Sequence, residues 1–101
     1  MILFNTTYLV SPEVEKRFLY WLSSVYAPKI KETGIVSNIR LFKVLTDEKD
    51  GISYSFQIES ESVTLMNEFK KKYLSQLELE VSQTFGERVL FFSTYLKQYD
   101  L

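Results

Sequence analysis

The segment from Ile52 to Glu59 alternates strictly between apolar and polar side chains. This period of two residues is typical of a β-strand with one buried face. The apolar positions are Ile52, Tyr54, Phe56 and Ile58, and the polar positions are Ser53, Ser55, Gln57 and Glu59. We therefore expect a strand over residues 52–59 that faces a core on one side and a more polar environment on the other.

Three further segments have β character. Residues 2–10 are rich in β-branched and aromatic residues, and their more apolar face is Ile2, Phe4, Thr6, Tyr8 and Val10. Residues 35–45 predict a second strand with less distinct faces, and residues 88–97 predict a fourth strand that is apolar on both faces. The polar residues 46–51 predict a hairpin loop between the second strand and the strand over 52–59.

The segment between the first two strands has the period of a helix. Ser11 is expected to cap this helix and Pro12 to occupy its first turn, while Thr33-Gly34 ends it. Pro28 removes one backbone hydrogen bond, so we expect a kink there, or a stop and a short restart. The predicted apolar stripe is Val14, Phe18, Trp21, Leu22 and Val25.

A second helical segment begins at Ser60 or Ser62 and ends at Phe85-Gly86. Its predicted apolar face is Leu65, Met66, Phe69, Tyr73, Leu77 and Val81. The resulting order is β-α-β-β-α-β, so residues 1–101 are expected to form a single α+β domain with the ferredoxin-like fold. Right-handed crossovers place both helices on one face of a four-stranded antiparallel sheet of order 4-1-3-2.

The sheet face away from the helices is expected to be mixed in character. Its polar positions would be Asn5, Thr7, Asn38, Arg40, Ser53, Ser55, Gln57, Ser93 and Tyr95. Its apolar positions would be Leu3, Leu9, Phe42, Val89 and Phe91. Such a surface is too apolar to be indifferent to water and too polar for a dry core.

The fourth strand lies at a predicted sheet edge and carries the unprotected run Val89-Leu90-Phe91-Phe92, which needs a cover. Two copies packed sheet against sheet would supply one and form a dimeric α+β barrel with a central cavity. The residues expected to line that cavity and orient a ligand are Asn5, Thr7, Arg40, Ser55, Gln57 and Tyr95. The alternative is a monomer whose second face is solvated.

Composition removes several chemistries. The chain has no cysteine and no histidine, so disulfides, thiolate metal sites and imidazole bases are excluded, and we expect no cofactor and no metal. Its three glycines each end an element, which leaves no glycine-rich phosphate loop. A calcium-binding loop aligned on Gly51 would require strong oxygen ligands at positions 46 and 57. Thr46 and Gln57 occupy these positions, so the sequence does not match such a loop.

RNA-recognition domains share the predicted topology and stack bases on the two central strands. Their motif needs a basic residue before a glycine and outward-facing aromatic residues. Here Asp50 precedes Gly51, and Tyr54 and Phe56 fall on the expected core face. With a net charge of −1, we expect no nucleic-acid partner. Because no long apolar run and no basic leader are present, we also expect no membrane span and a cytoplasmic location.

Residues along almost the whole chain resemble an uncharacterised bacterial family of domains of unknown function. The resembling positions are Met1-Ile2, Asn5, Thr7, Trp21, Pro28, Thr33-Gly34, Gly51, Tyr54, Gln57, Phe85-Gly86, Phe92, Thr94 and Leu96. The resemblance implies a ferredoxin-like fold of the dimeric α+β barrel type and no established activity. Members often carry histidine two residues before the helical proline, where this chain has Tyr26.

Catalysis has less support than binding. A serine nucleophile would need Lys43 or Glu59 as its base, and no spacing ties either residue to a serine. Cofactor-independent oxygenases of the dimeric barrel superfamily use Asn, Trp and Tyr side chains. In this chain Asn5, Trp21 and Tyr95 would take those roles, although the position of Trp21 on the helical stripe predicts a core residue.

The leading hypothesis is a homodimer that binds a small, mostly apolar molecule between its sheets. A cofactor-independent monooxygenase or isomerase is the first alternative, and an interaction domain without a pocket is the second.

Overall fold

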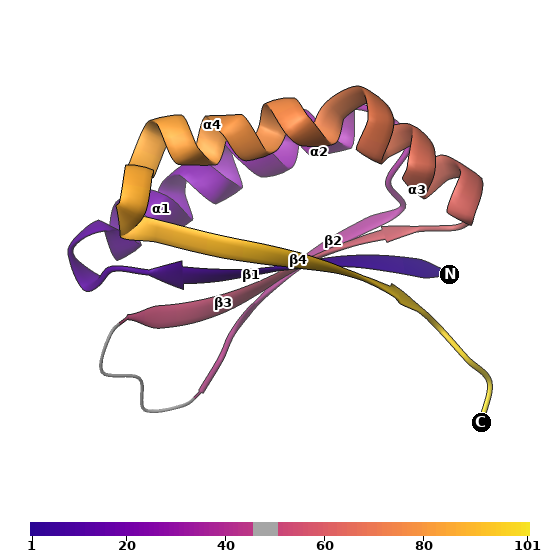
Figure 1. Cartoon of the computed structure of the whole chain (residues 1–101), viewed down its shortest axis with the longest axis horizontal. Helices are drawn as coiled ribbons and strands as arrows, with labels where there is room; N and C mark the ends of the chain where they lie inside the picture. The colour runs from indigo at the N-terminus through magenta and orange to yellow at the C-terminus, as the bar shows by residue number, and fades with distance from the viewer. Residues whose placement is uncertain (46–50) are drawn as a thin grey trace.

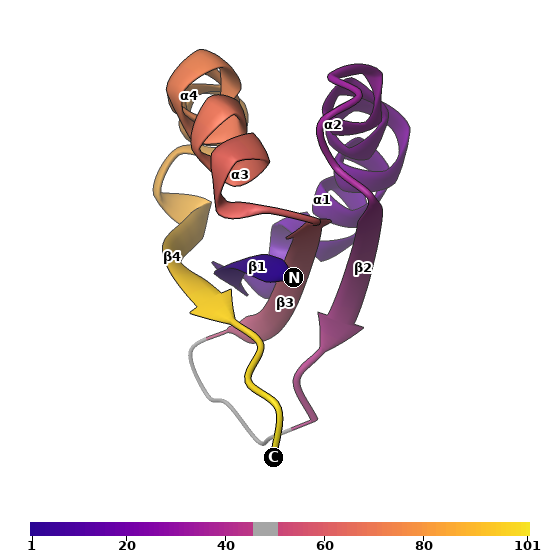
Figure 2. The same cartoon turned by 90° about the vertical axis from the view of Figure 1, so that its right-hand side faces the viewer.

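The computed structural model describes residues 1–45 and 51–101. Its strands β1 (Ile2–Val10), β2 (Asn38–Lys43), β3 (Ile52–Ser60) and β4 (Val89–Lys97) form one antiparallel sheet of order β2-β3-β1-β4. The helices lie together on one side of this sheet (Figures 1 and 2). The predicted ferredoxin-like fold is therefore confirmed, with β1 and β3 in the centre. Most of the predicted hairpin loop, including Asp47, Glu48 and Asp50, lies outside the described residues.

The core lies between the helices and one face of β1 and β3. Every second residue of β1, from Ile2 to Val10, is buried, as its alternation predicts. In β3 the buried residues are Tyr54, Phe56, Ile58 and Ser60. The polar alternates of β3 therefore face away from the helices, as predicted.

The first helical segment consists of η1 (Pro12–Val14), α1 (Glu15–Trp21), the π-helical η2 (Leu22–Tyr26) and α2 (Ala27–Glu32). Within the described part of the chain, the Ser11 side chain forms no capping bond, so that expectation was wrong. Instead, the Ser11 carbonyl oxygen accepts a hydrogen bond from the Val14 amide at 3.1 Å. Gly34 follows the helix with φ of 71°, in the left-handed region that favours glycine, as expected for its end.

The π turn changes which residues of this segment are buried. The Ala27 amide donates to the Leu22 carbonyl, five residues back, just before Pro28, which has no amide proton to donate. The wider turn rotates the following residues, so Tyr26 and Ile30 are buried while Val25 is 36% exposed. The prediction that Val25 belongs to the apolar stripe was wrong for this reason. Near Pro28 the chain neither stops nor restarts, because a π turn joins α1 to α2.

The second helical segment consists of α3 (Val63–Phe69), the π-helical η3 (Lys70–Leu74), α4 (Ser75–Phe85) and the short η4 (Gly86–Arg88). Ser62 caps it by accepting a hydrogen bond from the Leu65 amide at 3.2 Å. Here too a π turn changes the packing: Leu74 is buried and Tyr73 is half-buried, whereas the helical period predicted Tyr73 on the apolar face.

Two strand predictions need correction. β2 begins at Asn38 rather than residue 35, because Ile35 and Val36 pack against the core as irregular chain. In β4, Val89 and Phe91 face the helices, although the sequence analysis placed them on the opposite face. Both faces of β4 are apolar, so alternation alone did not distinguish them. The antiparallel register with β1 does, because it pairs Val10 with Val89 and Tyr8 with Phe91.

The change of helical register predicts a contrast between two aliphatic residues. Truncating buried Ile30 to alanine should lower the free energy of unfolding by about 2–5 kcal/mol, because it leaves a cavity in the core. Val25→Ala should change it by about 0.5 kcal/mol or less, as for most surface substitutions. Urea denaturation of both variants measures this difference. Equal losses would contradict the burial produced by the π turn.

Candidate functional site

The centre of the open sheet face, the face turned away from the helices, is a chain of polar side chains. Gln57 Nε2 donates to Ser55 Oγ at 3.4 Å, and Ser55 Oγ donates to Asn5 Oδ1 at 2.5 Å. Asn5 Nδ2 in turn donates to Thr7 Oγ1 at 3.3 Å. The register that pairs Asn5 with Gln57 and Thr7 with Ser55 brings these four residues together. Four of the six residues expected to line a cavity thus lie in one hydrogen-bonded group.

The direction of this chain leaves protons for a ligand. Gln57 Nε2 and Asn5 Nδ2 each give one of their two protons within it, and Thr7 Oγ1 accepts from Asn5 while no described residue accepts a hydrogen bond from the Thr7 hydroxyl. A hydroxyl has one proton to give as well as lone pairs to accept. Thr7 can therefore donate to a molecule bound at this face.

Arg40 lies on the same face but already has a partner. It pairs with Gln57 across β2 and β3, and its guanidinium forms an ion pair with the Glu59 carboxylate. This ion pair partly neutralises the guanidinium charge. Arg40 therefore lies at the border of the polar group and has fewer free hydrogen-bond donors for a ligand than the sequence suggested.

Exposed apolar side chains flank the polar centre. On β4 they are Leu90, Phe92 and Leu96, of which Leu90 is 55% and Phe92 64% exposed. On β2, at the opposite edge of the face, Phe42 is also exposed. A hollow of about 400 Å³ opens on this surface and is lined by Thr7, Leu9, Ser53, Leu90, Phe91 and Phe92. The sequence analysis missed Leu90 and Phe92 here because it placed the outward side of β4 towards the helices.

Tyr95 lies on the other side of the sheet, so its assignment to the same face as Asn5 was wrong. It pairs with Phe4 across the strands, and the two ring centroids are 4.8 Å apart on the helix side. Ser93 was misplaced for the same reason, since its hydroxyl lies 2.9 Å from Thr6 Oγ1 in the core layer. The strict alternation of β4 requires both corrections, once Val89 is placed in the core.

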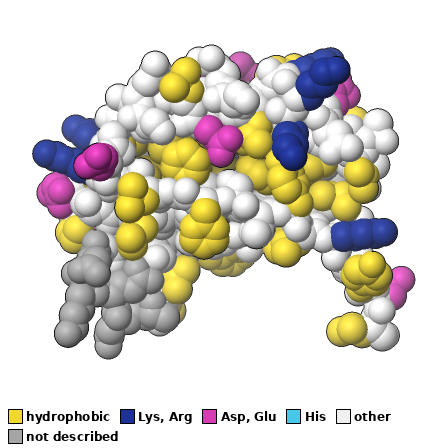
Figure 3. Space-filling model, viewed as in Figure 1, with side chains coloured by type: hydrophobic (Ala, Val, Ile, Leu, Met, Phe, Trp, Pro, Cys, Tyr) yellow, Lys and Arg dark blue, Asp and Glu magenta, His cyan; other side chains and the backbone are white. Residues whose placement is uncertain are grey.

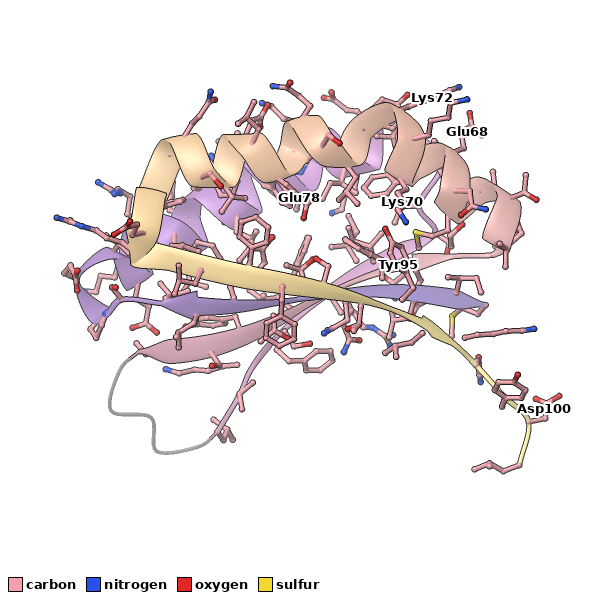
Figure 4. The ribbon with its side chains drawn as sticks, in the orientation of Figure 1. Glu68, Lys70, Lys72, Glu78, Tyr95 and Asp100 are labelled. Carbon is pink, nitrogen blue, oxygen red and sulfur yellow. The ribbon has the colours of Figure 1, made fainter. Side chains whose placement is uncertain are left out.

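A second polar group lies on the helix side, between α4 and the sheet. Glu78 and Lys70 project from the second helical segment towards Tyr95 on β4 (Figure 4), and Lys70 Nζ lies 4.7 Å from the centroid of the Tyr95 ring. Burial raises the pKa of the Glu78 carboxyl, and burial raises the pKa of Tyr8 and of Tyr26, with the charge of Glu78 adding to both shifts. In the view of Figure 3, apolar side chains are exposed along the boundary between the helices and the sheet. Burial therefore disfavours the charged form of the Glu78 carboxyl.

Tyr54 and Glu15 connect β3 to the start of α1. The Tyr54 hydroxyl donates to Glu15 Oε2 at 2.6 Å, and Lys43 Nζ lies 3.4 Å from the same oxygen. Burial and this hydrogen bond raise the pKa of Tyr54 to about 12, while the hydrogen bond from Tyr54 lowers the pKa of Glu15. The three residues form a structural contact in which Lys43 is engaged with a carboxylate.

The residues considered for a cofactor-independent oxygenase do not form one site. Asn5 is on the open face, while Trp21 and Tyr95 are on the helix side. Trp21 packs on Tyr26 and Phe85, with ring centroids 4.9 and 5.6 Å away, which agrees with the core role predicted for it.

The described residues lack two features, a cluster of metal-ligating side chains and a membrane-spanning helix. No three acidic, histidine or cysteine side chains among residues 1–45 and 51–101 come together as metal ligands would. In the same residues, no helix combines the length and the hydropathy needed to span a membrane.

Several solved structures share this fold. A Deinococcus radiodurans protein named as a candidate antibiotic biosynthesis monooxygenase has 13% identity and a TM-score of 0.71, covering 100% of this chain and 95% of its own. HapK from Hahella chejuensis has 13% identity and a TM-score of 0.71, with 98% and 93% covered. A Bacillus halodurans protein named as a member of the ethyl tert-butyl ether d (EthD) family has 10% identity and a TM-score of 0.68, with 98% and 100% covered. At these identities the likeness concerns the fold alone.

A family model described as a domain of unknown function, DUF4286, matches residues 1–99. No curated protein matches the chain by sequence.

The position of Glu78 predicts a pH-dependent stability difference. Since the folded-state pKa of Glu78 is raised, ionisation of this carboxyl opposes folding as pH rises through its unfolded and folded pKa values. Glu78→Gln should therefore be more stable than the wild type at pH 7 and no more stable near pH 3, as measured by urea denaturation. Glu87→Gln, at an exposed position, is the matched control and should show no such change. A Glu78→Gln protein less stable than wild type at pH 7 would contradict the burial of this carboxyl.

Proposed function

This chain belongs to the DUF4286 family of domains of unknown function, and we propose that it acts as a homodimer that holds a small, mostly apolar ligand between two open sheet faces. The observation that carries the proposal is the composition of the open face. A hydrogen-bonded polar centre in which the Thr7 hydroxyl still has a proton to donate lies beside an exposed apolar surface and a hollow. Such a surface suits a ligand with an apolar body and an oxygen that accepts a hydrogen bond.

The orientation of β4 supports a covered face. Its outward residues Leu90, Phe92 and Leu96 are apolar, as are Val89 and Phe91 on its inward side. An edge strand that turns an apolar side away from its own core needs another surface to bury that side. A second copy is the simplest source of that surface, since a two-fold interface is self-complementary.

The polar centre supports a ligand between the copies rather than a dry contact. Facing sheets pack about 10 Å apart, and their side chains fill that space. Two facing Asn5–Ser55–Gln57 groups would be buried without enough apolar neighbours to make a dry core. A bound molecule that accepts from Thr7 and covers Leu9, Leu90 and Phe92 would use both parts of the face.

The two other hypotheses require different features. An interaction domain without a pocket requires a dimer in which side chains fill the space between the two sheets. A cofactor-independent monooxygenase or isomerase is favoured by the names of two structures that share the fold and by Glu78 with its raised pKa on the helix side. Oxygen uptake in air with 1,4-dihydroxynaphthalene, compared between the wild type and Glu78→Gln, separates this enzyme from a binding protein.

The proposed homodimer predicts the mass of the protein in solution. The wild type should have twice the monomer mass by light scattering at micromolar concentration, and Phe92→Glu should be a folded monomer, because a charge would be buried in the interface. Tyr20→Glu is the matched control, since Tyr20 is 71% exposed on α1, away from the open face, and should leave the dimer intact. A wild-type protein of monomer mass would overturn the proposal.

The ligand generates a second prediction, with 2-naphthol as the probe. Thr7→Val keeps the shape of the side chain and removes its donor, so it should weaken 2-naphthol binding by roughly fivefold to tenfold, as expected for one hydrogen bond. Naphthalene, which has no oxygen, should bind the wild type and Thr7→Val equally. Thr94→Val, on the same face but outside the hollow, should not change either affinity. Fluorescence titration measures all six affinities. Unchanged 2-naphthol binding in Thr7→Val would contradict the assigned donor.

A further inference from the structure

We propose that residues 98–101 of each copy dock on the open face of the partner, with Tyr99 as the anchor in the hollow beside the partner's Leu90 and the partner's Phe92. This inference rests on the proposed homodimer and adds the segment that completes the interface. It assigns a role to side chains that have little contact with their own copy.

The segment leaves the sheet in a defined direction. The Gln98 amide donates to the Met1 carbonyl at 3.3 Å, which extends the pairing of β4 with β1 by one residue. Beyond this bond the chain runs away from the helices, on the side of the open face (Figures 1 and 2). Tyr99 is 77% exposed, and the Lys97 ammonium lies 5.7 Å from the centroid of its ring. Leu101 is fully exposed as well, so the segment presents two large apolar side chains on this side.

Symmetry determines which part of the partner this segment would meet. The segment follows Lys97, at the end of the sheet where Leu3 pairs with Leu96, and the hollow lies at the other end, where Leu9 pairs with Leu90. Consider a two-fold axis that lies in the plane between the two sheets and runs perpendicular to the strands. It reverses the strand direction and places β4 of one copy over β4 of the other. Residues 98–101 of one copy then reach the end of the partner that carries the hollow. An axis parallel to the strands would instead bring them to the partner's Leu3.

The lengths fit this arrangement. An extended backbone spans about 7 Å over the two residues from Lys97 to Tyr99, and the tyrosine side chain adds several ångströms. Facing sheets are about 10 Å apart, so the Tyr99 ring reaches the surface of the partner. The hollow of about 400 Å³ is larger than one aromatic ring requires, which leaves room for the ring at its rim and for a small ligand deeper inside.

The area of the sheet also calls for an additional contact. Strands of these lengths cover roughly 500 Å², with about 4.8 Å between strands and about 3.3 Å per residue. Stable complexes usually bury about 800 Å² on each partner. Residues 98–101 from both copies would supply much of the difference. Charge agrees with this placement, because Asp100 would approach the exposed Arg88 that precedes β4 in the partner.

The first test measures the dimer dissociation constant by analytical ultracentrifugation. Tyr99→Ser should raise it about tenfold or more, as expected when a buried aromatic anchor is truncated. The matched control Tyr20→Ser removes an equally exposed tyrosine from α1 and should leave it unchanged. An unchanged dissociation constant in Tyr99→Ser would overturn the inference.

The second test uses disulfide cross-linking, which the absence of native cysteine makes specific. The double variant Leu101→Cys and Leu90→Cys should form a covalent dimer on mild oxidation. Within one copy these positions are separated by most of β4, which spans more than 20 Å, whereas a disulfide needs Cα atoms within about 7 Å. The control pair Leu101→Cys and Leu3→Cys should give no covalent dimer.

The outcomes distinguish this inference from the function on which it depends. A monomeric wild type removes the homodimer and the docked segment together. A dimeric wild type in which only the Leu101–Leu3 pair cross-links keeps the homodimer and overturns the placement of residues 98–101. Cross-linking of the Leu101–Leu90 pair together with the loss of affinity in Tyr99→Ser supports it.

Discussion

The antiparallel pairing of β1 with β3 is the constraint on which this structure depends. Each pair in the register, such as Tyr8 with Tyr54 or Asn5 with Gln57, points both side chains to the same side of the sheet. The two strands therefore act as one surface with an aromatic and aliphatic side and a hydroxyl and amide side. The helices bury the first side. The polar group on the open face exists because the same pairing leaves the second side uncovered.

This constraint explains which parts of the fold could be predicted from the sequence. β3 alternates strictly between apolar and polar residues and one face of β1 is clearly the more apolar, so the faces of both strands, and the shared position of Asn5, Thr7, Ser55 and Gln57, followed directly. β4 is apolar on both sides, and only its pairing with β1 determines that Tyr95 faces the helices. The helical period could not reveal the two π turns, since each changes the register by backbone bonding and leaves the residue pattern as it was.

The two sides of the sheet also offer different chemistry. On the helix side, Glu78 lies among tyrosines and apolar rings, where burial opposes its ionisation. At the centre of the open face, Asn5, Thr7, Ser55 and Gln57 supply amides and hydroxyls, which neither ionise near neutral pH nor act as strong bases, while Arg40 and Glu59 at its border are paired with each other. Binding through hydrogen bonds therefore suits the open face, and the helix side holds a carboxyl whose ionisation burial opposes. A protein that used both would need a ligand able to reach across a sheet whose strands have no gap between them.

In the proposed dimer, the polar centre links ligand binding to association. Bringing two open faces together removes water from the Asn5–Ser55–Gln57 group of each copy, and buried polar groups are stable only when their hydrogen bonds are satisfied. The chain from Gln57 to Thr7 forms three such bonds and leaves one proton each of Gln57, Asn5 and Thr7 without a described acceptor, with Thr7 lining the hollow. A ligand that accepts the Thr7 proton stabilises the closed arrangement and has no equivalent site on the separated copies. By mass action such a ligand must favour the dimer. The affinity of the two copies for each other then rises with ligand concentration, and the affinity for the ligand rises with dimerisation, because the two equilibria are thermodynamically linked.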